Sequence, residues 1–311
     1  MKCITIEPEG PVINFDSIKF YGAVINAWAH LFPDELDFLI SEIKEGKVQF
    51  SSPLPYIDGT LYLPSPRVSF REAKKFVGEG KDAKRYEKID HVKKLKKTAY
   101  LPAEYVQELE GDVFPSFLME RIYKEEQFPT PKAHHDVRPH VQINRFDGSS
   151  TIFYLEDEIS YGVSEKEGKH LRPVHLKILY RGERERELDA ALKFIEDRGI
   201  SKKMSWGLGK VKLRRGTMKN EILPKIEGFH YLLSKYIPKD DEKKSIDVHG
   251  SRMDIGYLTG YRGDGEPIPQ IHYIKEGSLL KSDRKLIGEV IDEGDWTLSG
   301  TGFFLGDMYE N

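Results

Sequence analysis

The polar and apolar positions of the N-terminal fifty residues predict one strand followed by two helices. Residues 2–7 (KCITIE) alternate with a period of two, which is typical of a strand. Residues 17–32 are mostly small and apolar, and they predict a helix packed on a sheet. A second helix is predicted to begin at Pro33, because apolar side chains then recur at helical spacing at Leu36, Leu39, Ile40 and Ile43. Short β-like segments follow at 48–50 and 60–63.

Residues 64–91 lack this order and are charged and rich in glycine and lysine. We expect a mobile insertion here, with its most charged part at about 67–92. Residues 93–101 (KKLKKTAYL) are predicted to return to ordered structure.

A β-hairpin is the plainest pattern in the middle of the chain. The segment HVQINRF at 140–146 precedes the turn residues DGSS, and TIFYLED follows them at 151–157. Asp147 and Gly148 are typical of a hairpin loop.

Residues 173–213 predict a strand, a helix, a loop and a second strand in that order. The first strand, 173–180, alternates Val174, Leu176, Ile178 and Tyr180. The helix, 183–198, carries one apolar face made of Leu188, Ala191, Leu192 and Ile195. It ends at Gly199, and a strand follows at 210–213. This order is half of a βαββαβ unit, the ferredoxin-like or RRM-like plan.

The remainder of the chain, 220–311, is strand-rich and indicates a second, less regular domain. Its turns are predicted at four residues, Gly263, Gly265, Pro267 and Pro269.

Composition narrows the class of protein. The 311 residues suggest about two domains. Hydrophobic residues make up 39% and charged residues 32%, which excludes a disordered tail and a membrane protein. The single cysteine, Cys3, excludes an intramolecular disulfide and a cysteine-rich zinc site. Residues 1–20 lack the apolar core of a signal peptide, so we expect a cytoplasmic protein with no membrane partner.

The net charge of −3 conceals segments of strong and opposite charge. Residues 67–103 hold twelve basic and five acidic residues, and residues 201–219 hold seven basic and no acidic residue. Residues 1–50 hold four basic and eight acidic residues, and residues 286–311 hold six acidic and no basic residue. A polyanion responds to the local field within a screening length of about 8–10 Å, so this distribution permits an anionic ligand. A solvated helix face explains a charge run equally well.

The segment 199–209 (GISKKMSWGLG) combines features that suit a nucleic acid. Its glycines let backbone N–H groups approach phosphate or sugar, Lys202 and Lys203 supply charge, and Trp206 offers a stacking face. It lacks the spacing of a Walker loop and follows a helix instead of preceding one. The alternative is a tight helix-to-strand turn with exposed lysines.

Other candidate sites are weaker. The loop 294–306 is glycine-rich but lies among acidic residues, so we interpret it as structural or as facing a protein partner. Three histidines cluster at His134, His135 and His140, at a spacing that fits no standard zinc signature. His140, Asn144 and Arg145 are predicted on the hairpin strand, where a surface salt bridge is the alternative role of Arg145. There is no G-x-S-x-G elbow for nucleophilic catalysis.

Five segments in order resemble one family. They are DSIKFYGA at 16–23, LYLPSPR at 61–67, KKLKKTAYL at 93–101, HVQINRFDG at 140–148, and GISKKMSWGLGK at 199–210. This set resembles the RAMP-superfamily subunit of type III-A CRISPR (Csm) effector complexes that holds the 5′ handle of the crRNA.

The resemblance implies an α+β fold class with two ferredoxin-like (RRM-like, βαββαβ) domains, a β-hairpin thumb and glycine-rich loops. The first domain is expected at 1–219, with the charged insertion at about 67–92 and the hairpin at about 138–156. The second, at 220–311, is a modified and irregular ferredoxin-like domain.

The resemblance also implies a non-catalytic subunit in antiviral defence, without metal or cofactor. It implies binding of the crRNA 5′ handle and contacts with the large polymerase-cyclase-like subunit and the adjacent backbone RAMP subunit. The hairpin is expected to wedge into the guide–target RNA duplex near the handle.

The expected RNA-binding residues belong to the start of the first helix, the 93–101 segment, the hairpin and the glycine loop. They are Lys19, Tyr21, Gly22, Lys93, His140, Asn144, Arg145, Gly199, Ser201, Lys202, Lys203, Met204, Ser205, Trp206, Gly207 and Gly209. The loop departs from the family pattern at Met204 and Ser205, where a basic and a small residue are usual.

Two other hypotheses fit the same pattern. One is a RAMP endoribonuclease that processes CRISPR repeat RNA with a histidine as general base. The other is a scaffold whose loop only bridges protein subunits.

Overall fold

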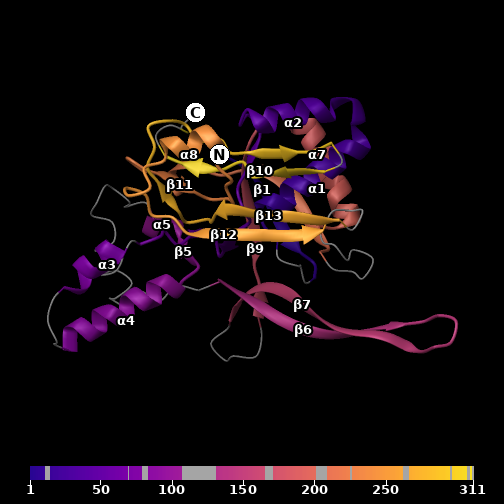
Figure 1. The fold of residues 1–311 in the computed structure, drawn as a ribbon, viewed down its shortest axis with the longest axis horizontal. Helices are drawn as coiled ribbons and strands as arrows, with labels where there is room; N and C mark the ends of the chain where they lie inside the picture. The colour runs from indigo at the N-terminus through magenta and orange to yellow at the C-terminus, as the bar shows by residue number, and fades with distance from the viewer. Residues whose placement is uncertain are drawn as a thin grey trace.

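The fold is described from a computed structural model of the chain. The structure describes residues 1–10, 15–68, 70–78, 83–106, 131–164, 171–200, 209–224, 226–261, 266–294, 296–306 and 309. It is a mixed α+β fold with several sheets (Figure 1).

The largest sheet has seven strands in the order β10-β1-β9-β3-β4-β5, with β2 paired to β9. Its strands are β1 (Lys2–Pro8), β2 (Gln49–Phe50), β3 (Leu54–Ile57), β4 (Thr60–Pro64), β5 (Tyr100–Pro102), β9 (His175–Arg181) and β10 (Val211–Thr217). β1 is antiparallel to both of its neighbours, β9 and β10. The predicted strands 2–7, 173–180 and 210–213 are confirmed, and 210–213 extends to Thr217.

Two helices cover one face of this sheet. α1 (Ser17–Leu31) follows β1, and α7 (Glu185–Arg198) connects β9 to β10. β9, α7 and β10 follow one another in the predicted order of strand, helix and strand, and β1 and β3 flank β9 in the same sheet. The predicted apolar face of α7 is buried against the sheet, together with Ile4, Ile6, Phe20 and Trp28. The helix predicted after Pro33 is confirmed as a 3-10 turn (Pro33–Glu35) followed by α2 (Leu36–Lys44).

The other face of the sheet contributes to a second core. Cys3, Leu54 and Leu179 point to this face and pack with Tyr231 and Phe303 of the C-terminal part. Both faces of β1 and β9 are therefore buried over part of their length, and the chain beyond residue 220 completes a core that the first sheet begins.

The expectation of a mobile insertion at 64–91 is corrected, because this segment contains two helices. They are α3 (Phe70–Val77) and α4 (Ala83–Lys97), followed by β5 and α5 (Ala103–Val106). Ala73 and Phe76 of α3 and Val92 and Leu95 of α4 are buried in the second core. These few apolar positions are enough to dock a helix pair, although the many lysines around them mask the helical period.

The hairpin is confirmed and is longer than expected. β6 (Pro131–Ile143) pairs with β7 (Ser150–Ser164), and β8 (Leu171–Pro173) pairs with β7 at the base. Figure 1 shows the hairpin extending away from the rest of the molecule.

The C-terminal part is strand-rich, as predicted. It contains β11 (His230–Leu232), α8 (Asp240–Ser245), β12 (Ile255–Tyr261), β13 (Pro267–Ile274), β14 (Leu279–Leu280), β15 (Val290–Asp292), β16 (Thr297–Ser299) and β17 (Phe304–Leu305). The placement of Pro267 and Pro269 in turns was wrong. Pro267 begins β13, and Pro269 lies where the register with β12 shifts between Leu258 and Gly260, positions at which a missing N–H is tolerated. Gly263 and Gly265 lie outside the described residues.

The glycine-rich segment 294–306 contributes to the core. Leu298, Phe303 and Phe304 are buried, and Asp292 just before the segment pairs with Lys44 at 2.9 Å. The structural interpretation of this segment is therefore confirmed for these residues, and part of its acidic charge is neutralised within the chain.

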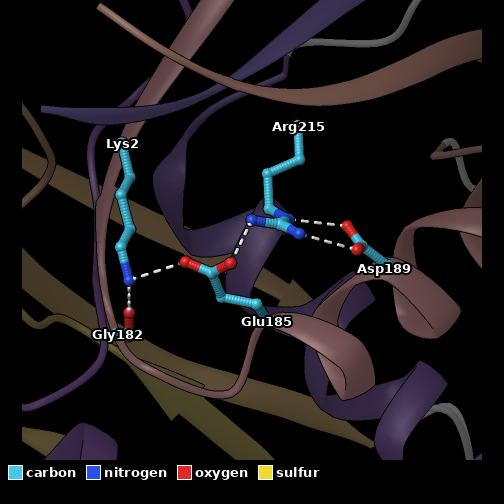
Figure 2. A network of polar contacts seen from close by, with 5 residues as sticks. All are labelled: Lys2, Gly182, Glu185, Asp189 and Arg215. Carbon is cyan, nitrogen blue, oxygen red and sulfur yellow. Dashed lines mark hydrogen bonds and ion pairs between the residues drawn. The ribbon is translucent and has the colours of Figure 1, made fainter.

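A polar network holds the first turns of α7 on the sheet (Figure 2). The guanidinium group of Arg215, on β10, donates to both carboxylate oxygens of Asp189 at 2.7 and 2.8 Å and to Glu185 at 2.6 Å. Lys2 of β1 donates to Glu185 at 2.9 Å and to the Gly182 carbonyl at 2.8 Å. The hydrogen bonds from Arg215 lower the pKa of Asp189, and those from Lys2 and Arg215 lower the pKa of Glu185.

This network predicts a pH-dependent contribution to stability. We expect Asp189→Asn to lower the free energy of unfolding by about 0.5–1 kcal/mol at pH 7, a small value because Asp189 is 49% exposed and water screens the pair. The folded pKa of Asp189 lies below its unfolded value. Its contribution is therefore complete above about pH 4 and disappears as the pH falls through the folded pKa.

Urea unfolding at pH 7 and at successively lower pH measures this effect. Asp197→Asn is the matched control, because Asp197 lies on the same helix and its ion-pair partner among the described residues is Lys193, at 3.7 Å. An Asp189→Asn effect that stays constant down to pH 2 would contradict the assignment.

Candidate nucleic-acid interface

One end of the large sheet brings together described residues that flank two of the segments that the sequence singled out. Pro8 at the end of β1 pairs with Val211 at the start of β10. Beyond this pair the Glu9 N–H donates to the Lys210 carbonyl at 2.9 Å. Glu9, on the way from β1 to α1, and Lys210, on the way from α7 to β10, therefore lie side by side, although they are 201 positions apart in the chain (210 − 9).

The first two turns of α1 leave two of the predicted residues accessible to a ligand. Asp16 caps the helix by accepting the Lys19 N–H at 3.0 Å. Lys19 is half-exposed and Gly22 is exposed, and a Cβ atom added at Gly22 would meet nothing within 4 Å. The backbone at Gly22 is therefore open to a ligand.

Two glycines define the base of the loop after α7. Gly199 ends the helix with φ 88°, and Gly209 has φ 71°, both in the region that side chains disfavour. The Ile200 N–H donates to the Gly209 carbonyl at 2.9 Å and closes the loop between them. The predicted contacts within the loop, Ser201, Lys202, Lys203, Met204, Ser205, Trp206 and Gly207, lie outside the described residues.

The sequence prediction did not include a row of cations that lies next to the base of this loop. Three exposed cations alternate here, with Lys210 just before β10 and Lys212 and Arg214 on it. β10 is the outermost strand on this side of the sheet. Glu9 approaches Lys212 at 2.8 Å and Lys210 at 3.5 Å. The hydrogen bond from Lys212 lowers the pKa of Glu9, so this carboxylate partly neutralises the row. The alternation K-V-K-L-R was the signal that could have identified it.

The placement of Tyr21 on the RNA-binding surface was wrong. Its side chain is fully buried, and its hydroxyl accepts the Phe50 N–H at 2.8 Å. Burial raises the pKa of this phenol. Successive helical residues point about 100° apart, so Tyr21 faces the core while Lys19 and Gly22 face outward.

Lys93 is also far from this edge. It lies on α4, which leads into β5 at the opposite end of the sheet from β10. Five strand spacings separate β5 from β10, which is about 24 Å. Lys93 therefore does not share this part of the sheet with β10, and its RNA contact stays a prediction.

The hairpin residues divide between a strand and a turn. His140 lies on β6, but the strand ends at Ile143, so the expectation that Asn144 and Arg145 continue it was wrong. The Asn144 N–H donates to the Ser149 carbonyl at 2.8 Å, and its side chain accepts the Phe146 N–H at 2.9 Å. This local hydrogen bonding ends the strand. The turn lies about 40 Å along the hairpin from its base.

The described residues form neither a cluster of metal ligands nor a membrane-spanning helix. His134, His135 and His140 all lie on β6, and no group of three metal-ligating side chains gathers within the described part of the chain. Among the same residues, no helix has the length and apolar character needed to cross a membrane.

A buried ion pair connects this edge to the C-terminal part. Lys235 donates to Asp16 at 2.8 Å, with side-chain exposures of 14% and 10%. The Lys235 N–H also donates to the Ser17 hydroxyl at 3.0 Å. Burial opposes the charge of Lys235, but the Asp16 carboxylate prevails and raises its pKa. The start of α1 is thus positioned by residues from both parts of the chain.

The chain is similar to a known CRISPR protein over most of its length. No model of a protein family matches the chain. The CRISPR system Cms protein Csm4 of Thermococcus onnurineus (strain NA1) is 28% identical over 284 residues, which are 90% of this chain and 86% of that protein. The chain resembles Csm4 over most of its length. The predicted resemblance to a subunit of Csm complexes is therefore confirmed as a similarity to Csm4.

Solved assemblies that contain Csm4 share the fold. One is the Csm3–Csm4 subcomplex in the type III-A CRISPR-Cas interference complex, with a TM-score of 0.60 and 19% identity over 98% of this chain and 99% of the other. Another is the Csm1–Csm4 cassette in complex with cA4, with a TM-score of 0.58 and 20% identity over 98% of both chains.

The buried hydroxyl of Tyr21 contributes to stability and not to RNA binding. Tyr21→Phe removes the acceptor of a buried N–H group, so we expect the free energy of unfolding to fall by about 1–3 kcal/mol. Denaturant unfolding measures this loss, and RNA binding by the folded variant should remain at the wild-type level. A specific loss of RNA binding at unchanged stability would restore the surface role of Tyr21.

The buried ion pair between Asp16 and Lys235 stabilises the start of α1. Asp16→Ala removes a helix cap and leaves Lys235 without its carboxylate, so we expect a loss of about 3–5 kcal/mol. The double variant Asp16→Ala, Lys235→Met should recover part of that loss, because it no longer buries an unpaired charge. Denaturant unfolding of both variants tests this, and additive losses would contradict the coupling.

Proposed function

We propose that this chain is a non-catalytic crRNA-binding subunit of a type III-A CRISPR interference complex and that it anchors the 5′ handle of the crRNA. The observation that carries the proposal is the pairing of Pro8 with Val211, which brings the residue that precedes the α1 segment and the residue that follows the glycine loop to the same end of the sheet. The resemblance to Csm4 supports the same function.

The chemistry of this edge suits single-stranded RNA. Such RNA is bound through phosphates, 2′-hydroxyls and stacked bases. The exposed backbone at Gly22 permits close approach, and Lys19, Lys210, Lys212 and Arg214 supply positive charge along the edge. Lys202 and Lys203 add phosphate contacts, and Trp206 stacks on a base or braces the loop.

The hairpin is proposed to contact the guide–target RNA duplex near the handle. Val141, Ile143 and Phe153 are about half exposed or more, and Phe146 at the turn is fully exposed. Val141 pairs directly with Phe153, so their side chains share one apolar face. Apolar side chains carried on a long ribbon are suited to wedging between stacked base pairs.

The protein partners are proposed by analogy with the solved assemblies. Csm4 occurs there with Csm1 in one case and with Csm3 in the other. We propose that this chain likewise bridges the large polymerase-cyclase-like subunit and the adjacent backbone RAMP subunit, in the cytoplasm.

The domain division belongs to the proposal too. We assign residues 1–219 to a ferredoxin-like domain, which the succession of β9, α7 and β10 beside β1 supports. We assign residues 220–311 to a modified ferredoxin-like domain that shares the second core with the first.

Binding of handle-bearing RNA tests the proposal. We expect Lys202→Ala with Lys203→Ala to weaken this binding by about 1–2 kcal/mol and to reduce the slope of log K against log salt by about 1.4, because two phosphate contacts to a single strand are lost. Lys243→Ala with Lys244→Ala, two exposed lysines of α8, is the matched control and should bind like the wild type.

Unchanged affinity of the Lys202, Lys203 variant would remove the loop from the site. RNA-independent assembly with the large subunit, insensitive to the same variant, would favour a scaffold. Incubation with CRISPR repeat RNA in the absence of metal tests the lack of catalysis. Clean cleavage that a single His→Ala change abolishes would replace the proposal with a RAMP endoribonuclease.

A further inference from the structure

The last turn of α4 carries a basic cluster that the proposed handle site does not use. We define the α4 cluster as Lys93, Lys94, Lys96 and Lys97, all of which are exposed. Val92 and Leu95 are buried in the second core, so the opposite face of the helix packs against the rest of the chain. The lysines are therefore held outward on an anchored helix.

The α4 cluster is poorly neutralised by its own chain. Lys93 approaches Asp90 at 3.1 Å, with side-chain exposures of 66% and 73%. Among the described residues, Lys94, Lys96 and Lys97 form no ion pair. Within the described part of the chain, three charged groups at one end of the helix are therefore not neutralised.

This arrangement is unfavourable for the isolated chain. Lys93 lies three and four residues before Lys96 and Lys97, and Lys94 lies three before Lys97, so like charges face one another at neighbouring positions of the helix. Each such pair destabilises a helix by about 0.2–0.5 kcal/mol. Attraction to the negative end of the helix dipole favours lysine in the last turn but does not require four of them. A bound polyanion would compensate the repulsion.

We propose that the α4 cluster is a second nucleic-acid-binding surface that contacts the phosphate backbone of a single strand without reading its sequence. It lies on the far side of the sheet from the handle-binding edge, about five strand spacings away. Figure 1 shows α4 on the opposite side of the molecule from α1 and α7. The two surfaces are therefore separate, and the second does not depend on the first.

The side chains favour nucleic acid over a protein partner. Lysine is depleted at protein–protein interfaces, whereas phosphate backbones are contacted mainly by lysine and arginine. On the outward face of α4, Tyr86 is the exposed aromatic residue, with 60% exposure, and it lies about two turns before Lys93. A single aromatic ring can stack on an unpaired base but forms no apolar centre for a protein interface.

Binding of the full chain to a 20-nucleotide RNA that lacks the handle sequence tests this inference. We expect Lys94→Gln with Lys97→Gln to weaken binding several-fold and to reduce the slope of log K against log salt by about 1.4, the value for two phosphate contacts to a single strand. Glutamine retains the helix propensity of lysine, so the helix should persist. Lys94→Arg with Lys97→Arg keeps the charge and should bind like the wild type.

Lys243→Gln with Lys244→Gln is the matched control, because these two exposed lysines also lie in the last turn of a helix. A DNA strand of the same sequence should respond to the α4 variant as the RNA does, because the phosphates are shared. Equal binding by the wild type and the α4 variant would overturn the proposal. So would a loss that appears only with an acidic polypeptide such as polyglutamate, since that outcome indicates a protein partner.

Discussion

The antiparallel pairing of β1 with β9 on one side and β10 on the other is the constraint on which the rest of the structure depends. These ladders join residues 2–8 to strands near residues 175 and 215, so most of the chain must close around the first strand. The register places Ile4 and Ile6 toward the helices and Cys3 toward the second core. A shift by one residue would exchange these faces and expose both sets of apolar side chains.

The same pairing determines where the loops meet. Because β1 and β10 are antiparallel, the end of one lies beside the start of the other, and the chain leaves the sheet twice at the same edge. The closure of the glycine loop by Ile200 and Gly209 and the cations of Lys212 and Arg214 on β10 then lie near the same end of the sheet. At the described base of this loop, glycine occupies the two positions that require positive φ.

The two parts of the chain are cooperative rather than independent. Tyr231 and Phe303 fill the core that Leu54 and Leu179 begin, and Lys235 supplies the counter-charge of the α1 cap. Removing one part would expose the apolar face of the other and leave a buried carboxylate unpaired. The edge proposed to bind the handle and the α4 cluster nevertheless remain separate, because β10 and β5 lie at opposite edges of one sheet.

The sequence by itself determined the elements whose period is strong, namely β1, α1, α2, β9, α7 and the hairpin turn at Asp147 and Gly148. It also indicated the glycine loop and the Csm resemblance, since residue type and order carry both. Only the tertiary structure decided which residues share a surface. Tyr21 is buried because its helical phase points to the sheet, Lys93 is remote because α4 leads to the far edge, and α3 and α4 fold because Phe76, Val92 and Leu95 find a core supplied partly from beyond residue 220. Local pattern sets the conformation of a segment, whereas its neighbours depend on contacts between residues that lie far apart in the chain.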